Sequence, residues 1–403
     1  MRGLGWRIRC MVLMTMMSGV CCACGNGGDA TAHTIVDVNQ ATQEVLEETA
    51  GQEAALKGQA VTLEGEDIPT LAVEETQEVL ESQEVEQQIT TITISAVGDV
   101  TLGTHQEQDY YASFRQVYDQ AEDEGYFFQN VQDIFGTDDC TIVNLEGNFT
   151  FSENRNGDRT YFIKGDPEYA RLLTHGSVEV ATMANNHRLD FGEEGSRDTV
   201  KALEAEGITY AYDNNVAIYE TKDIRIGVVA VNEIGWGAGV ESLLQDGIAK
   251  LKEQEVDLIL TCCHWGIERE NYPEDYQKEL GRKCIDWGAD LVIGHHPHVI
   301  QGIEEYQGKF IIYSLGNFCF GANRNPVDKD CMIFQQTFTF IDGVKQQEQA
   351  IQVIPCSVSS VSDRNNFQPT PATGDEATRI LNRINEYSRD FGVLLDSEGK
   401  LIK

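Results

Sequence analysis

The chain has 403 residues, of which 41% are hydrophobic, so it is long enough to bury a large core and is typical of a globular protein. Its 66 acidic and 30 basic residues give a formal net charge of −36. A charge of this size argues against nucleic acid and anionic lipid headgroups as partners unless a metal screens the contact, and favours cationic, neutral or metal-bridged ligands.

The first residues have the pattern of an export signal. A short basic segment precedes an uncharged run over residues 11–23, which is too short to cross a bilayer as a helix. Cys24 stands where a bacterial lipoprotein signal places its lipid-modified cysteine, although Cys21 occupies the usual leucine position. We expect residues 1–23 to be removed and Cys24 to be lipidated, anchoring an extracytoplasmic protein to the cell membrane. A plain cleaved signal and an uncleaved anchor are the alternatives.

An acidic segment follows. Residues 24–92 contain fifteen acids and one lysine, almost no aromatic residues and no sustained apolar period. Such a composition cannot bury enough apolar surface to fold by itself. We expect residues 24–88 to be a disordered linker that holds the folded body away from the membrane.

Strand-like and helix-like patterns alternate from residue 89 onward, which predicts an α/β architecture with much parallel pairing. Amphipathic helices are expected at 114–124, 196–206, 240–254 and 275–287. Five strand-like runs end in residues that can bind metal or move protons, namely at Asp99, at Glu146, at 185–187, at His264 and at 295–298.

The pattern changes after His298 to strands without intervening helices. Strands are expected at 303–306, 310–315, 333–340 and 349–354, with a turn at Asp342-Gly343. These strands predict an antiparallel edge or a second sheet. A last helix is expected at 376–391, so we divide the body into a main domain over 89–358 and a C-terminal helical extension over 359–403.

The strand ends supply the ligands that a pair of divalent ions requires. Loops at the carboxyl ends of strands are where α/β folds place ligands. Two ions a few ångströms apart need a bridging carboxylate and mixed oxygen and nitrogen donors, which suits Mn, Fe, Zn or Mg. The candidate ligands are Asp99, Glu146, Asn186, His264, His296 and His298. His187, directly after Asn186, is placed to act as a general acid.

The seven cysteines beyond residue 24 show no CxxC spacing, which argues against a zinc ribbon. Several lie in apolar, strand-like runs, so buried thiols are expected, with one disulfide as the alternative. The cysteines beyond residue 24 are Cys140, Cys262, Cys263, Cys284, Cys319, Cys331 and Cys356.

Six ordered motifs over roughly residues 93–320 resemble the CapA family of capsule-synthesis proteins, a branch of the calcineurin-like metallophosphoesterases. They are Gly98-Asp99, Asn144-Leu145-Glu146-Gly147, Ala184 to Gly192, His264-Trp265-Gly266 with Glu268, Gly294 to His298, and Ser314 to Phe318. The resemblance implies a four-layer α/β/β/α metallophosphoesterase-like sandwich with its metal cluster at one edge of two sheets. It also implies a link to poly-γ-glutamate capsule assembly.

The same resemblance implies a role for each candidate. Asp99 and His298 would hold the first metal, Glu146 would bridge, and the second metal would be held by Asn186, His264 and His296. His187 would be the proton donor, paired with Asp190 or with a nearby carboxylate.

One feature departs from the superfamily pattern. The opening motif is Asp99-Val100-Thr101 where the superfamily has Asp-x-His, so the first metal lacks one nitrogen ligand. His105 is a possible substitute at the wrong spacing. The site would hold two metals weakly, or only one.

Other residues carry two interpretations each. Glu268 and Asn317 fit the family pattern and would face the cleft, but Glu268 would equally pair with Arg269 or Lys283. The aromatic residues Trp236 and Trp265 would stack on substrate or pack in the body. Two cations near the motifs, Arg159 and Lys164, are candidates to receive an anionic substrate.

Three functional hypotheses follow. The first is a metal-dependent hydrolase at the cell surface that acts on phosphoester or amide bonds of an anionic polymer such as poly-γ-glutamate, or of its precursor. The second is a noncatalytic assembly factor that binds the polymer beside membrane synthase subunits. The third is a purely structural metal cluster, which the open Asp, Glu and Asn ligand set argues against.

Overall fold

The computed structural model describes residues 87–402. The predicted export signal, Cys24 and the acidic linker up to residue 86 lie outside the described residues. None of the helices within 87–402 has the length and apolar character needed to cross a membrane.

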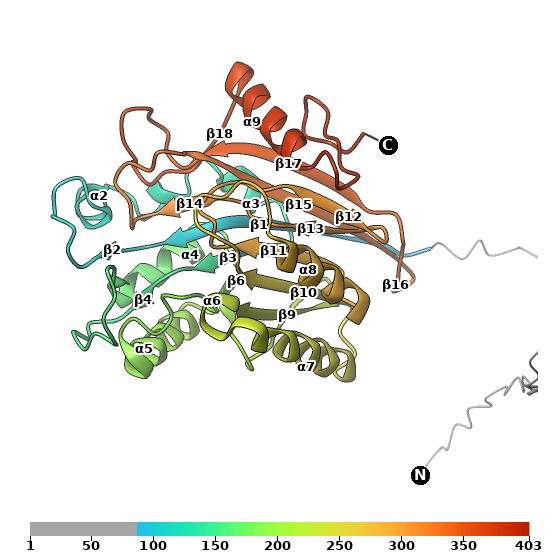
Figure 1. The fold of residues 1–403 in the computed structure, drawn as a ribbon, viewed down its shortest axis with the longest axis horizontal. Coiled ribbons are helices and arrows are strands. Elements are labelled where there is room, and N and C mark those ends of the chain that lie inside the picture. Colours follow the sequence, from blue (N-terminus) through green and yellow to red (C-terminus); the bar gives the residue numbers. More distant parts are fainter. Residues whose placement is uncertain (1–86, 403) are drawn as a thin grey trace, which may run out of the picture. The chain divides into compact units, whose positions relative to one another are not determined.

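Two β-sheets form the centre of the body (Figure 1). The larger has the order β18-β17-β15-β1-β3-β6-β7, with β14 added to β1 and β16 to β15. Its strands are β1 (Ile89–Thr101), β3 (Cys140–Leu145), β6 (Val180–Thr182), β7 (Thr209–Ala211), β14 (Asn317–Phe320), β15 (Asp330–Ile341), β16 (Val344–Lys345), β17 (Ala350–Ser357) and β18 (Thr370–Pro371).

The smaller sheet has the order β12-β13-β11-β10-β9-β8. Its strands are β8 (Ala217–Thr221), β9 (Ile224–Asn232), β10 (Leu258–His264), β11 (Leu291–His295), β12 (Ile303–Tyr306) and β13 (Lys309–Ile312). A third, short sheet lies beside the site and consists of β2 (Thr104–His105), β5 (Ile163–Gly165) and β4 (Asn148–Phe149).

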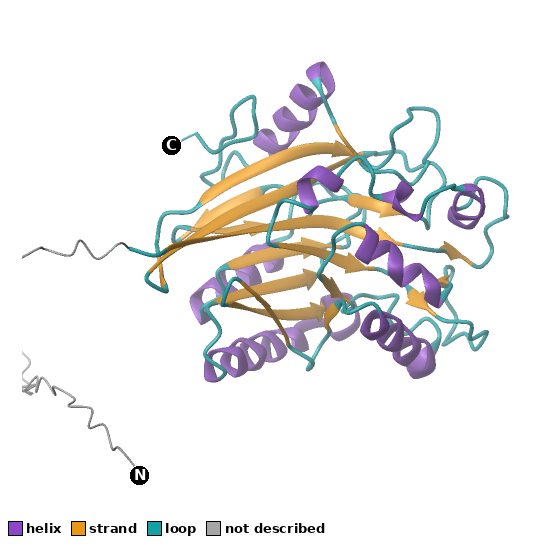
Figure 2. Ribbon diagram, turned by 180° about the vertical axis from the view of Figure 1, so that it is seen from behind, coloured by secondary structure: helices purple, strands orange, loops and turns teal. Residues whose placement is uncertain are grey.

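Helices cover the outer faces of both sheets (Figure 2). The first group is α2 (Phe114–Gln120), η1 (Glu124–Phe127), α3 (Gln132–Phe135), η2 (Pro167–Ala170), α4 (Arg171–His175) and α5 (Gly192–Ala205). The second group is α6 (Glu233–Trp236), η3 (Gly237–Gly239), α7 (Val240–Glu253) and α8 (Asp275–Trp287), and α9 (Gly374–Tyr387) follows the last strands.

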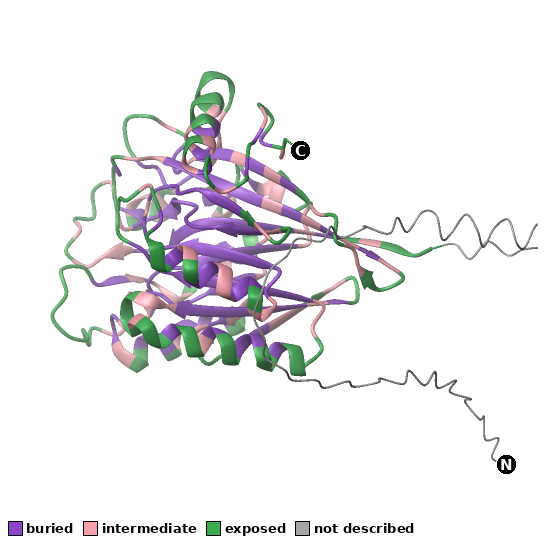
Figure 3. Cartoon of the chain, turned by 45° about the vertical axis from the view of Figure 1, so that its right-hand side comes forward, coloured by how far each residue is buried: buried purple, intermediate pink, exposed green. Residues whose placement is uncertain are grey.

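Three apolar clusters define the layers. One lies between the sheets and joins residues such as Ile94 of β1 to Leu260 of β10. The second packs the first helix group on the larger sheet, and the third packs α7 and α8 on the smaller one. Figure 3 shows the result, with buried strands at the centre and helices exposed on their outer sides. The predicted four-layer α/β/β/α sandwich is confirmed.

Helix α9 belongs to this body through both packing and charge. Its buried residues Ile380, Leu381 and Ile384 join the apolar cluster between the sheets. Arg379 Nη2 lies 2.7 Å from Asp330 Oδ1, and Arg383 Nη2 lies 2.7 Å from Asp328 Oδ2. The residues after 358 therefore tie the end of the chain to β15 and to the loop before it.

Some elements differ from prediction for local reasons. The helix expected at 114–124 ends at Gln120, because Ala121 has extended backbone angles. The helix expected from 196 begins at Gly192, and its first turn is polar, so the apolar period did not reveal it. The hairpin β8–β9 was not predicted, although β9 pairs with β10 in the smaller sheet. The helix at 275–287 is confirmed, and the chain reverses at Asp342 and Gly343, which both have positive φ.

Two half-buried carboxyl groups lie at the end of the larger sheet opposite the site. Burial raises the pKa of Glu179 to about 7 and that of Asp138 to about 6. Glu179 accepts a hydrogen bond from the Thr141 amide at 2.8 Å, and Asp138 accepts one from the Thr141 hydroxyl at 2.7 Å. Because these acids titrate higher in the native than in the unfolded chain, the native state binds the extra protons.

We therefore expect the contribution of Glu179 to the free energy of unfolding to increase as the pH falls from about 7 toward 4.5. Glu179→Gln keeps an acceptor for Thr141 and should raise the free energy of unfolding above pH 7 by roughly 1 kcal/mol, discounted for partial exposure. Urea unfolding at pH 5.5 and pH 8.5 tests this. A gain that is equal at both pH values would contradict it.

Candidate metal centre

The carboxyl ends of strands from both sheets meet at one edge. In the larger sheet Asp99 is the register partner of Asn144 and of Asn317. In the smaller sheet His264 is the register partner of His295. His295 Nε2 lies 3.0 Å from the Val97 carbonyl oxygen in β1, so this histidine joins the sheets. The strand ends that carry the candidate ligands therefore meet at one edge of the two sheets, as predicted.

Asp99 is fully buried and held on three sides. Asn144 donates a hydrogen bond to Oδ1 at 2.8 Å, and the His296 amide donates one to Oδ2 at 3.3 Å. His298 Nδ1 lies 3.1 Å from Oδ2. Burial acts to raise the pKa of this carboxyl, but the His298 hydrogen bond and nearby histidine charges hold the pKa well below its usual range. Asp99 is thus ionised, which is the form in which a carboxylate binds metal.

The Glu146 carboxylate gives the strongest indication that this cluster could bind an ion. Its carboxylate is buried, and neither oxygen has a hydrogen-bond partner among the described residues. Oε1 lies 3.9 Å from Nε2 of His187, 3.9 Å from Nε2 of His264 and 3.8 Å from Nε2 of His298. Burial raises the pKa of Glu146 to about 7.

An unpartnered buried carboxylate is rare in native proteins and asks for an explanation. Metal–nitrogen and metal–oxygen bonds are about 2.0–2.2 Å long, so two ligand atoms of one ion lie at most about 4.4 Å apart, and the separations of 3.8–3.9 Å fall within this limit. The Nδ1 atom of the buried His296 also has no partner among the described residues. The donors present therefore fit divalent metal.

The predicted second-metal ligands lie together. His264 Nε2 is 2.8 Å from Asn186 Oδ1, and the rings of His264 and His296 have centroids 4.8 Å apart. Burial holds the pKa of His264 well below its usual range and lowers that of His296 to about 4. Both rings are thus neutral at pH 7, which is the form that binds metal.

His298 is shared between two groups of possible ligands. Asp99, Glu146 and His298 form one group, and Glu268, His296 and His298 form the other, each with its ligand atoms within 4.8 Å of one another. Burial acts to lower the pKa of His298, but the Glu146 and Asp99 carboxylates raise it to about 10. Glu268, for which the sequence left open a place in the cleft or a pair with Arg269 or Lys283, joins the candidate ligands.

The Nε2 atom of His187 faces the cluster of candidate ligands. Its Nδ1 lies 2.8 Å from Oδ2 of the buried Asp190, which leaves Nε2 directed at Glu146. Asp190 is fixed in turn by the Ile163 amide at 2.7 Å and by Arg159 at 3.2 Å. The two residues are in contact as expected, and the role of the pair in proton transfer stays a prediction.

Several other candidates are placed by their contacts. His105 lies edge-on to Tyr161, with ring centroids 5.2 Å apart, and belongs to neither ligand group. Arg159 bonds to Asp190 and to the Asn186 carbonyl, and Lys164 pairs with Glu153 at 2.6 Å. These two cations are therefore already paired within the protein.

The remaining candidates divide between packing and surface. Trp265 is fully buried and donates to the Tyr313 carbonyl at 2.9 Å, so it packs in the body. Trp236 is exposed and does not line the cleft described below. Lys283 pairs with Glu241, and within residues 87–402 no ion pair joins Glu268 to Arg269 or Lys283.

Two asparagines position the ligands and were not assigned from sequence. Asn144 contacts Asp99, lies 3.3 Å from His264 Nδ1, and accepts a hydrogen bond from Asn185. Asn185 also accepts the His187 amide at 3.1 Å. Both stand inside the quoted motifs, so their position beside Glu146 and Asn186 was the available signal.

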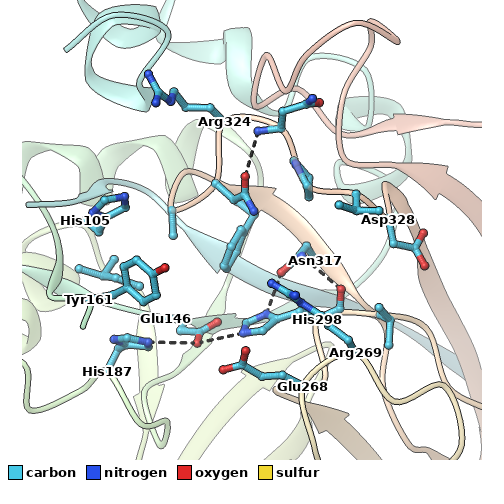
Figure 4. A pocket seen from close by; sticks show the side chains of 18 of the residues that line it. His105, Glu146, Tyr161, His187, Glu268, Arg269, His298, Asn317, Arg324 and Asp328 are labelled. Carbon is cyan, nitrogen blue, oxygen red and sulfur yellow. Dashed lines mark hydrogen bonds and ion pairs between the residues drawn. The ribbon is translucent and has the colours of Figure 1, made fainter. Parts of the chain in front are cut away.

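A cleft of about 720 Å³ opens onto the cluster (Figure 4). Glu146, His187 and His298 lie at its base, and the loop that contains Arg324 and Asp328 forms its far wall. The protein is therefore an α/β/β/α sandwich with a candidate divalent-metal site at the edge of its sheets, below an open cleft.

Comparison with known proteins identifies the family. The model of the bacterial capsule synthesis protein family PGA_cap matches residues 93–322. The chain belongs to this family, which confirms the predicted resemblance.

The individual relatives described next are 26–28% identical to the chain. The chain is 28% identical over 249 residues to the PGA biosynthesis protein CapA of Bacillus subtilis, covering 57% of this chain and 63% of that protein. It is 27% identical to the capsule biosynthesis protein CapA of Bacillus anthracis, covering 57% of this chain and 60% of that protein. The chain thus spans less than two thirds of each. A probable polyglutamine synthesis accessory protein of Mycobacterium tuberculosis is 26% identical, over 64% of this chain and 74% of that protein.

Solved structures resemble the chain at low identity. A hypothetical protein from Thermus thermophilus has a TM-score of 0.39 at 16% identity, covering 66% of this chain and 99% of that one. TT1561 of the same organism has a TM-score of 0.37 at 10% identity, covering 60% of this chain and 94% of that one.

Proposed function

We propose that this protein is a metal-dependent hydrolase that acts at the cell surface in the assembly of a capsule polymer such as poly-γ-glutamate. The observation that carries the proposal is the Glu146 carboxylate, buried without a hydrogen-bond partner among the described residues and facing three imidazole nitrogens at 3.8–3.9 Å. The capsule role is supported by the family and by the names of the curated relatives.

In this proposal the residues of the cluster either hold metal or donate a proton. Asp99, Glu146 and His298 would hold one divalent ion, and Asn186, His264 and His296, with Glu268 beside them, a second. When bound, such ions polarise the scissile phosphoester or amide bond and make water a stronger nucleophile. His187 would protonate the leaving group from Nε2, with Asp190 holding the ring in the required orientation.

The test begins with metal. Protein stripped with a chelator is reconstituted separately with Mn, Fe, Zn or Mg, its metal content is measured, and it is assayed on model phosphodiesters and on γ-glutamyl peptides. Turnover that returns with one of these ions supports the hydrolase. Protein that holds metal but turns over neither substrate class with any ion would refute it.

A noncatalytic assembly factor is the second candidate, and one contact favours it. Thr101 stands where the superfamily has a histidine, and its hydroxyl donates to the Glu146 carbonyl at 2.9 Å. His105 lies on the cleft wall, so the first metal gains no nitrogen from it. Capture of poly-γ-glutamate that a chelator abolishes, without any shortening of the polymer, would favour this function.

The cellular setting is part of the proposal. Lipidation of Cys24 would tether the body to the membrane, close to the membrane synthase subunits that produce the polymer. Metabolic labelling with a palmitate analogue tests this, since Cys24→Ser should remove both the label and the membrane association.

A further inference from the structure

Arg269 lies at the metal centre without an ionic partner among the described residues. It lines the cleft together with Glu146, His187 and His298, and Figure 4 places it beside His298 and Glu268. Its guanidinium makes no hydrogen bond or ion pair with any described residue. Arg159, also near the centre, bonds to Asp190, and Arg155 pairs with Glu107 at 2.9 Å. Arg269 is exposed, so its guanidinium is accessible to a ligand in the cleft.

The backbone holds Arg269 in place at a conformational cost. The Glu270 amide donates to the Ile267 carbonyl at 3.2 Å, which closes a turn with Arg269 at its third position. There φ is +67°, a left-handed value that favours glycine or asparagine. The Arg269 amide also donates to the Pro297 carbonyl at 2.8 Å, between the ligands His296 and His298. His296 and His298, on either side of Pro297, also have positive φ, so the left-handed backbone at Arg269 is one of three such positions around the candidate ligands.

The charges explain what this side chain can bind. Asp99, Glu146 and Glu268 would balance much of the charge of a divalent ion, and the cations Arg269 and Arg324 lie on the same cleft. Arg324 donates to the Tyr111 carbonyl at 3.2 Å, which leaves Arg269 as the cation beside the ligands whose donors are uncommitted among the described residues. A guanidinium fork matches the two oxygens of a carboxylate or phosphate.

We propose that Arg269 binds an oxyanion of the substrate, a carboxylate or a phosphate, next to the metal centre, and so orients the bond to be acted on. The inference rests on the proposed function for the position of the reacting bond. Arg269 is on this account a positioning residue for anionic substrates. It also provides local positive charge on an otherwise acidic protein.

Two substitutions separate this role from a structural one. Arg269→Gly removes the guanidinium and relieves the left-handed backbone, so stability should stay equal or increase. Arg269→Lys keeps the charge but loses the fork and should restore binding only in part. Lys283→Gln removes one exposed positive charge that pairs with Glu241, away from the cleft, and serves as the matched control.

The probes are inorganic phosphate and a synthetic γ-glutamyl oligomer, titrated calorimetrically into full-length manganese-loaded and chelator-treated protein. A charge-assisted hydrogen-bond pair is worth a factor of about 10 to 100, so Arg269→Gly should weaken binding at least tenfold. Metal content should be unchanged, and Lys283→Gln should bind as wild type does. The probe that loses more affinity identifies the oxyanion as carboxylate or phosphate.

The inference is overturned if wild-type protein binds neither probe, or if Arg269→Gly binds both within twofold of wild type. Neither result depends on turnover. If Arg269→Gly loses binding while no metal supports hydrolysis, the hydrolase function fails and the anion site stands.

Discussion

Replacing His187 with alanine is expected to lower the turnover of metal-loaded protein by about 100- to 10,000-fold, the usual contribution of a general acid. Nε2 of His187 faces the Glu146 carboxylate at 3.9 Å, while Nδ1 of the same ring contacts Asp190. Loss of the ring removes the proton donor without removing a predicted metal ligand. Metal content, measured by mass spectrometry, should therefore remain that of the wild type.

Asp190→Asn is the companion variant. The amide oxygen can still accept the Ile163 amide and keep the loop in place, but it no longer stabilises the protonated ring of His187. We expect a smaller loss than for His187→Ala and a changed pH–rate profile. Full activity of His187→Ala, with metal bound, would rule out this histidine as the acid.

Replacing Glu146 with glutamine should have opposite effects on the metal-free and metal-loaded protein. The buried carboxylate has no hydrogen-bond partner among the described residues, and its pKa of about 7 shows that the charged form is disfavoured there. Glutamine is neutral and nearly isosteric. Metal-free Glu146→Gln should therefore be more stable than wild type by about 2 kcal/mol above pH 8.

The sign follows from proton binding. The ordinary pKa of 4.5 rises to about 7 in the native state, so the native chain binds the proton first. At this residue wild-type stability increases as the pH falls from about 7 toward 4.5 and decreases as the pH rises through 7. The advantage of glutamine should accordingly shrink below pH 6.

With metal the order reverses. An ion that binds only the native state at 100 times its Kd adds about 2.7 kcal/mol of stability. Glu146→Gln removes the charge that would bridge the ions and should lose most of this gain. Thermal unfolding at pH 8.5 with and without manganese measures both effects. A variant that keeps the full metal-dependent stabilisation would show that Glu146 is not a ligand.

The sequence predicted the position of the centre well because one rule governs it. Parallel strands deliver their carboxyl-end residues to one edge, so Asp99 and His264 meet although they lie in different sheets. Asn144 was not assigned because its role depends on the register of β1 against β3, which sets its amide between Asp99 and His264. The pattern of apolar and polar residues in a sequence does not determine such side-chain contacts.

Charge partners could not be read from the sequence either. Arg159 and Lys164 were candidates for substrate because they stand near the motifs, but the fold brings Asp190 and Glu153 against them. Arg269 was considered only as a partner of Glu268. Within residues 87–402 no ion pair joins these two residues, and Arg269 adopts a positive φ that the sequence does not reveal.

The salt bridges of α9 connect this helix to the wall of the cleft. Asp328, which Arg383 holds from α9, is also part of the cleft wall opposite the metal ligands. Helix α9 therefore supports one side of the opening through Arg383. A substitution at Arg383 is therefore expected to alter the cleft wall without changing a candidate metal ligand.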